Sequence, residues 1–184
     1  SMPRPIVTSV RAINRNGSIV ISKTDSVRIE AKLSDNKGVR GLKLEYFYDN
    51  LEKEGETKVQ QEMTLSSGVW EYTLPKKTDR TLVRYRLLAD FGKGSEIISP
   101  RPSDPYKWHA YFVMPRSTGS NRYFELMVPR AGTSQLAKNM SANPRSGYRP
   151  ARNVKPRGPW NDTVHGILVH EGVVRDVYAR WNGS

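Results

Sequence analysis

Cysteine is absent from this 184-residue sequence, and acidic residues are fewer than basic ones. Without cysteine, disulfide scaffolds, structural zinc sites and thiol nucleophiles are excluded. No apolar run approaches the ~18 residues that a membrane-spanning helix needs, so a transmembrane helix is excluded as well. A Walker-type phosphate loop and a Gly-x-Ser-x-Gly nucleophile motif are also missing from the sequence. These absences point away from the common nucleotide-binding and hydrolase classes.

The excess of basic residues favours acidic partners. Lys and Arg number 30 and Asp and Glu 18, so the net charge is +12. Such a charge suits nucleic acid, a cell-wall polymer, an anionic lipid surface or an acidic protein. The charges are spread over many alternating positions, and a solvated surface that serves only solubility is the simpler explanation.

The first 115 residues show repeated alternation of apolar and polar side chains. Val27, Ile29, Ala31 and Leu33 point one way, with charged or polar residues between them. This period of two is typical of a half-buried strand. The pattern returns at residues 42–48, 70–74 and 83–89, and turn residues separate the segments at 35–38, 66–68 and 92–94. The spacing predicts a mainly β protein built on an antiparallel β-sandwich.

The inward-facing side chains of these segments form the predicted core. They are Val27, Ile29, Ala31, Leu44, Tyr46, Trp70, Tyr72, Val83, Tyr85 and Leu87. Several are aromatic, which is also the composition of a carbohydrate-binding platform. Their inward parity favours core packing instead. Phe47 has the opposite parity.

The segments 26–49, 63–75 and 81–105 resemble the immunoglobulin-like or fibronectin-III-like modules of large bacterial extracellular proteins. The resemblance depends on the tight link from Ser34 to Val39, on the inward Trp70 and on Tyr85 near the end of the series. It implies an Ig-like fold for residues 4–115 and says nothing of a ligand. A Cys…Trp…Cys spacing is absent, so the disulfide-bonded antibody type is excluded.

A different pattern follows this region. Residues 116–120 read as a flexible linker. A strand is predicted at 123–128, a short helix at 131–140 and a β-hairpin at 164–181 around Glu171-Gly172, with an irregular Pro/Arg-rich insertion at 141–160. Residues 1–3 are expected to be a cloning remnant or leader.

Residues 121–184 resemble the opening of the spore-coat protein H (CotH) kinase-like family. The matching residues are Phe124, Leu126, Val128, Val164, Gly166, Val169, Gly172, Val174, Val177, Arg180, Gly183 and Ser184. The ending Arg180-x-x-Gly183-Ser184 is the most specific part. The insertion before Trp160 departs from the family pattern.

This resemblance implies a secreted or cell-surface bacterial protein whose parent transfers phosphate from ATP with Mg²⁺ or Mn²⁺. The groups for that chemistry would follow Ser184. We therefore expect no catalytic residue, no cofactor and no enzyme activity in this segment. Its expected partner is the rest of the kinase-like domain.

A basic cluster lies inside the insertion. It consists of Arg145, Arg149, Arg152, Lys155 and Arg157, with Tyr148 and Trp160 interleaved. Cations with aromatic residues suit a nucleic acid or a sugar polymer, and within a kinase-like parent the cluster would recruit acidic or phosphorylated substrate segments. The simpler interpretation is a solvated insertion, because its prolines prevent a helix.

Two function classes remain. The first is a non-catalytic accessory module that spaces or docks a kinase-like domain, and the second is a binding module for an anionic polymer.

The three histidines do not predict a metal site, because His165 and His170 are an odd number of residues apart on one predicted strand and face opposite sides. A monomer is favoured over a dimer formed through the apolar face of residues 169–181.

Overall fold

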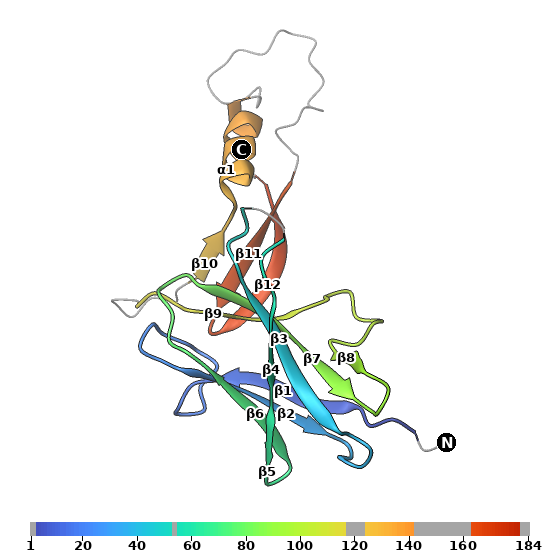
Figure 1. Ribbon diagram of the computed structural model, residues 1–184. Coiled ribbons are helices and arrows are strands. Elements are labelled where there is room, and N and C mark those ends of the chain that lie inside the picture. Colours follow the sequence, from blue (N-terminus) through green and yellow to red (C-terminus); the bar gives the residue numbers. More distant parts are fainter. Residues whose placement is uncertain (1–2, 53–54, 117–123, 142–162, 181–184) are drawn as a thin grey trace. The chain divides into compact units, whose positions relative to one another are not determined.

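The computed structural model describes residues 3–52, 55–116, 124–141 and 163–180 (Figure 1). The chain divides into two compact units, the first built from β1 to β9 and the second mainly from β10, α1, β11 and β12. The predicted mainly β class is confirmed. The predicted domain boundary at 116–120 lies mostly outside the described residues, so the division into domains stays a prediction.

The first sheet of the first unit has the strand order β1-β2-β6-β5. These strands are β1 (Val7–Ile13), β2 (Val27–Leu33), β5 (Thr64–Ser66) and β6 (Val69–Leu74). Each neighbouring pair is antiparallel. The outer strand β5 has only three residues, all of them exposed, which limits the length of unpaired backbone at that edge.

The second sheet has β3 and β7 at its centre, running side by side (Figure 1). Its strands are β3 (Gly41–Asp49), β4 (Val59–Glu62), β7 (Leu82–Asp90), β8 (Ser95–Ser99) and β9 (His109–Phe112). β4 pairs with β3, while residues 87–90 of β7 pair with β8 and residues 82–85 pair with β9. One side of β7 is therefore shared by two short strands, and residues 100–108 leave the sheet between them.

Buried residues of both sheets belong to one hydrophobic cluster, which confirms the predicted inward parity. All ten predicted core residues are in it or packed against it, and Tyr72 is the one that is only partly buried. Ile29, Leu44 and Leu87 have no exposed surface. Burying a side chain of this size contributes about 1.5–3 kcal/mol. The alternation read from the sequence therefore identifies the side chains that stabilise this unit.

Trp70 connects this cluster to the turn between β2 and β3. Its side chain is buried, and its indole N–H donates a hydrogen bond of 2.9 Å to the side-chain oxygen of Asn36. A buried indole N–H needs such a partner. Gly38 in the same turn has a φ of 76°, which favours glycine. The predicted tight link is thus fixed by its own backbone and by the core tryptophan.

The second unit is a three-stranded sheet with one helix. Its elements are β10 (Phe124–Met127), α1 (Arg130–Ser141), β11 (Val164–His170) and β12 (Val173–Ala179). The sheet order is β10-β11-β12. Glu171 and Gly172 form the turn with φ values of 48° and 81°, as a two-residue hairpin with two positive φ angles requires. The predicted strand, helix and hairpin are confirmed, and among the described residues the last strand ends at Ala179.

A close approach packs the helix against the sheet of this unit. A Cβ atom added at Gly132 would lie 2.6 Å from Val128 Cγ1 and 3.6 Å from Val164 Cβ. The short distance is to Val128, just before α1, so a larger side chain at Gly132 would require Val128 to move, whereas the distance to Val164 on β11 is an ordinary contact. Within the described part of the chain, no helix has both the length and the apolar character needed to cross a membrane.

Candidate functional site

The predicted site residues fall mostly outside the described part of the chain. Arg145, Arg149, Arg152, Lys155 and Arg157 all lie there, as do Gly183 and Ser184 of the predicted family motif. Arg180 follows directly after β12 and is exposed. The basic cluster and the family motif therefore stay predictions.

The two histidines of β11 contact different partners. His165 Nε2 lies 3.1 Å from Asp176 Oδ1 on β12, and the ring of His170 stacks on Phe124 with ring centroids 4.0 Å apart. Among the described residues no group of three or more His, Asp and Glu side chains is placed to hold a metal ion. These two contacts join strands of the same three-stranded sheet.

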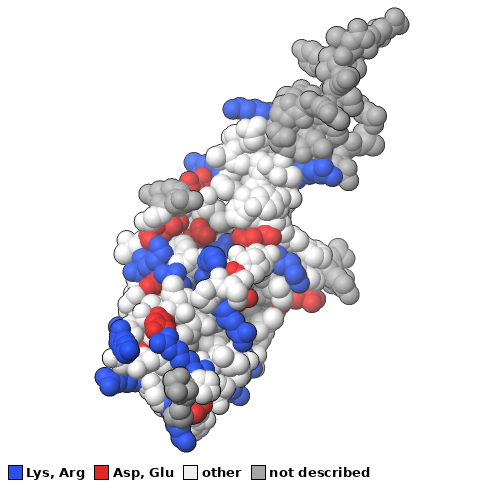
Figure 2. Space-filling model, turned by 90° about the vertical axis from the view of Figure 1, so that its right-hand side faces the viewer, with Lys and Arg blue, Asp and Glu red and all other residues white. Residues whose placement is uncertain are grey.

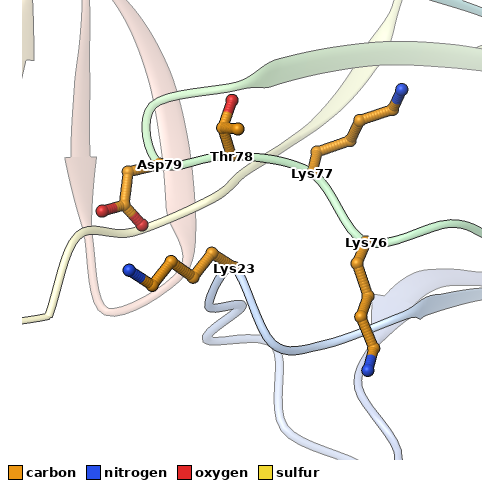
Figure 3. A pocket seen from close by; sticks show the side chains of 5 residues that line it. All are labelled: Lys23, Lys76, Lys77, Thr78 and Asp79. Atoms are coloured by element: carbon orange, nitrogen blue, oxygen red, sulfur yellow. The ribbon is translucent and has the colours of Figure 1, made fainter.

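A hollow opens at one end of the first unit. Its volume is about 740 Å³, and its lining residues are Lys23, Lys76, Lys77, Thr78 and Asp79. Lys23 belongs to the connection between β1 and β2, and the others belong to the connection between β6 and β7. In Figure 3 the side chains of Lys23 and Asp79 extend toward the same region, while those of Lys76 and Lys77 extend in different directions. We call these five residues the lysine hollow.

Tyr48 and Asp25 interact with lysines of the hollow. The Lys77 ammonium lies 4.3 Å from the centre of the Tyr48 ring, a cation–π contact. Burial raises the pKa of the Asp25 carboxyl, but hydrogen bonds from Ser22 and Asn14 and the charge of Lys76 outweigh it, so the pKa is lowered overall. Asp25 therefore stays ionised, and its Oδ2 atom accepts hydrogen bonds from Ser22 and Asn14.

A group of tyrosines lies in the core near Tyr48. Tyr85 and Tyr111 have ring centroids 6.3 Å apart, and burial raises the pKa of both hydroxyls. The Tyr111 hydroxyl is buried and has no hydrogen-bond partner among the described residues. Leaving such a group unsatisfied costs about 1–3 kcal/mol.

The outer face of the second sheet carries buried ions. Glu45 is 5% exposed and accepts hydrogen bonds from Arg86 at 2.8 Å and from Gln60 at 2.6 Å. Arg84 is 7% exposed and pairs with Asp49 at 3.2 Å. Parity correctly predicts that these side chains point away from the core, but it does not predict that they are buried.

Two aromatic residues lie beside these ions. Phe47 and Trp108 meet edge to face with ring centroids 4.9 Å apart. The Arg86 guanidinium lies 4.1 Å from the centre of the Trp108 ring, and the Lys58 ammonium lies 5.5 Å from that of Phe47. Both rings are only partly exposed. Because their surfaces already contact cations and each other, they do not form an open platform for a sugar. Phe47 is distinguished in the sequence by its parity, whereas nothing in the local pattern around Trp108 predicts that it contacts Phe47.

A serine and a histidine meet where β8 ends and β9 begins. Ser99 Oγ lies 2.7 Å from His109 Nε2, a contact that the sequence did not predict. Burial lowers the pKa of His109, and the nearby Asp104 charge opposes this effect in part. Ser99 is 6% exposed, so its hydroxyl is poorly placed to attack a substrate. The pair joins the two ends of the 100–108 connection.

Charges of both signs are mixed on the described surface. Figure 2 shows Lys and Arg side chains interspersed with Asp and Glu on the face that it presents. The net charge is therefore not gathered into one large basic surface on that face.

Searches of protein-family models, curated proteins and solved structures find no match to this chain.

Proposed function

We propose that residues 4–115 form an Ig-like β-sandwich that serves as a non-catalytic accessory module, spacing or docking a neighbouring domain of an extracellular protein. The observation that carries this proposal is the strand order. β1-β2-β6-β5 corresponds to the order A-B-E-D of an Ig sandwich, and β4-β3-β7-β8 corresponds to C′-C-F-G. Two sheets in this order that share one hydrophobic cluster are expected to pack face to face.

The polar clusters of the first unit support a structural role. Glu45, Arg86 and Gln60 bond to one another, and Ser99 bonds to His109 across the ends of a connection. A catalytic centre instead needs reactive groups that are open to substrate and stabilised for its reaction. The groups most able to do chemistry in this unit are engaged in holding strands and connections together.

We further propose that the parent protein is a bacterial cell-surface protein with a CotH-type kinase-like domain, which would open at residues 121–184. The order of strand, short helix and hairpin in β10, α1, β11 and β12 supports this proposal, as do the matching residues named above. ATP and Mg²⁺ or Mn²⁺ would be needed only by that parent domain. The present chain would supply no group for phosphoryl transfer.

Nucleotide binding tests the non-catalytic role directly. We expect ATP with Mg²⁺ or Mn²⁺ to leave the melting temperature of the chain unchanged, because a ligand that binds only the folded state would raise it. We also expect no transfer of labelled phosphate from ATP to a generic acceptor protein. Saturable nucleotide binding at micromolar affinity would overturn the proposal.

The second candidate function is binding of an anionic polymer. The net charge of +12 favours it, and residues 145–157 were its predicted site. A heparin column separates the two functions at low cost. Retention at physiological salt with a steep salt dependence favours polymer binding, and elution well below that salt favours the accessory role alone.

A further inference from the structure

One edge of the three-stranded sheet is formed by β12, the last strand in the order β10-β11-β12. Its seven residues, Val173–Ala179, include neither proline nor glycine, whereas the other edge strand, β10, has only four residues. The edge strand β1 of the first unit also has seven residues, but its register shifts between Val7 and Ser9. Short strands, prolines and bulges hinder the pairing of an edge with another chain. Among the described strands, β12 is thus a long edge that neither shortness nor proline protects.

The turn of the hairpin determines which backbone groups of β12 point outward. Both turn residues before Val173 have positive φ, as in a two-residue hairpin, and the residues that flank such a turn bond to each other. Val173 therefore directs its N–H and C=O toward β11, and this direction returns at every second residue. The alternate residues Val174, Asp176 and Tyr178 direct theirs to the outer side, with which no strand among the described residues pairs.

One face of β12 carries an acidic side chain and then a basic one. Asp176 and Tyr178 share this face by strand parity, and Arg180, directly after the strand, continues the alternation. His165 of β11 contacts the first two residues: its Nε2 lies 3.1 Å from Asp176 Oδ1, and its ring centroid lies 5.8 Å from that of Tyr178. Tyr178 is 75% exposed. The open edge therefore presents a large aromatic ring between opposite charges.

A second copy of this chain matches these charges in a particular register. Two copies of β12 related by a two-fold axis pair antiparallel, and one residue lies on the axis because paired side chains share a face. An axis at Arg175 or Asp176 brings like charges together. An axis at Val177 instead places Asp176 opposite Tyr178 of the second copy and diagonal to its Arg180, within reach of long side chains. An axis nearer either end leaves more of the strand unpaired.

The order of the charges favours a second copy of this chain over an arbitrary strand. Backbone hydrogen bonds alone do not discriminate between partners, so discrimination depends on the side chains. An acidic residue followed on the same face by a basic one is complementary to its own copy when the strand direction is reversed. A strand with like charges at these positions would be repelled.

We propose that β12 pairs with β12 of a second copy of this chain, antiparallel about an axis at Val177, so that the two sheets become one. Asp176 pairs with Arg180 of the second copy, and symmetry repeats this contact. Neither residue gives up its other contacts, because a carboxylate accepts and a guanidinium donates several hydrogen bonds. This dimer replaces the monomer favoured by the sequence, and it does not depend on the function proposed above.

Two charge variants test the pairing, Asp176→Arg and Arg180→Asp. Each variant has like charges at the two positions, so alone it should dimerise at least about tenfold more weakly than the unaltered chain. An equimolar mixture of the two should restore dimerisation, because opposite charges meet again in the mixed dimer. Sedimentation equilibrium over a dilution series measures each association constant. Restoration in the mixture also shows that both variants are folded.

Arg175→Asp is the matched control, since it makes the same charge change as Arg180→Asp on the other face of β12. It should weaken dimerisation far less. The proposal is wrong if the unaltered chain stays a monomer at its highest soluble concentration, or if the mixture associates no better than the separate variants. It is equally wrong if the control weakens dimerisation as much as Arg180→Asp does.

Hydrogen exchange in the unaltered chain tests the register without any substitution. The backbone N–H groups of Val174, Asp176 and Tyr178 should exchange more slowly as the protein concentration rises, because they become hydrogen-bonded between the copies. The N–H groups of β10, at the other edge of the sheet, should be unaffected. Equal slowing at both edges, or a dimer that forms without slowing at β12, would overturn the proposal.

Discussion

The two faces of the second sheet bury their side chains by different means. Leu44 and Glu45 are neighbours on β3, and they are 0% and 5% exposed. Leu44 belongs to the hydrophobic cluster shared by the two sheets, whereas Glu45 on the opposite face accepts hydrogen bonds from Arg86 and Gln60. Two adjacent residues are thus equally hidden from water, one by apolar contacts and the other by matched charges.

The difference determines how each face responds to change. Apolar burial has no preferred direction, and a core tolerates other side chains of similar volume. A buried carboxylate is stable only while its cation and its hydrogen bonds remain. Substitutions on the inner face should therefore lower the free energy of unfolding in proportion to the side-chain volume that they remove. On the outer face the loss should depend on which member of an ion pair remains without its partner.

The largest expected effect is on the inner face. Leu44→Ala should lower the free energy of unfolding by about 2–5 kcal/mol, since it removes buried apolar contacts and leaves a cavity. Leu44→Met keeps most of the volume and should cost less than about 1.5 kcal/mol. Chemical denaturation measures both. Equal losses for the two variants would show that the site is not a close-packed core position.

The next effect tests the outer face. Glu45→Ala should cost about 1–3 kcal/mol, less than a fully buried pair would, because the Arg86 side chain is 22% exposed and keeps its contact with Trp108. Adding Arg86→Met should restore part of this loss, since the unpaired cation is then removed. A double-mutant cycle with Glu45→Ala, Arg86→Met and both together gives the coupling. Simple additivity of the two losses would contradict the proposed pairing.

The sequence predicted the inner face well and the outer face poorly. Alternation alone identified Leu44, Tyr46 and Leu87 as inward, because side chains on a strand change sides at every residue. Glu45 is bonded to Arg86, which lies 41 residues away, and Arg86 in turn contacts the ring of Trp108. Pairings between distant residues depend on strand register, and a local pattern does not contain it.

The candidate site shows the same limit. Lys76 and Lys77 are adjacent in sequence, but Lys23 joins them only because β2 pairs with β6 and brings two connections to one end of the sheets. The sequence drew attention to residues 145–157 instead, where the cations are close together along the chain. Density of charge along a sequence does not reveal charges that the fold brings together from distant segments, and the cluster at residues 145–157 stays a prediction.

A smaller effect with the opposite sign is expected within the core. Tyr111→Phe removes a buried hydroxyl that has no hydrogen-bond partner among the described residues and keeps the ring. The variant should be more stable by about 1 kcal/mol, because the cost of the unsatisfied group disappears. Tyr85→Phe is the control from the same cluster. A loss of stability in Tyr111→Phe would show that the hydroxyl has a partner in solution.

The smallest effect is a change in the pH dependence of stability. It tests whether the inner face of the second sheet excludes water as far as His109 on β9. His109 lies opposite Tyr85 in the register of β7 and β9, and its ring centroid is 5.3 Å from that of Tyr85. Burial lowers the pKa of His109, so the folded chain holds this proton less tightly than the unfolded chain. Stability should therefore fall as the pH drops below the unfolded value of about 6.5, and it should level off once His109 is protonated in the folded state.

His109→Gln should remove this fall in stability between neutral pH and about pH 5. His165→Gln, which alters an exposed histidine, should retain it, and denaturation curves between neutral pH and about pH 5 measure the difference. If His109→Gln keeps the same slope as the unaltered chain, His109 is solvated in the folded state and the inner face ends before β9.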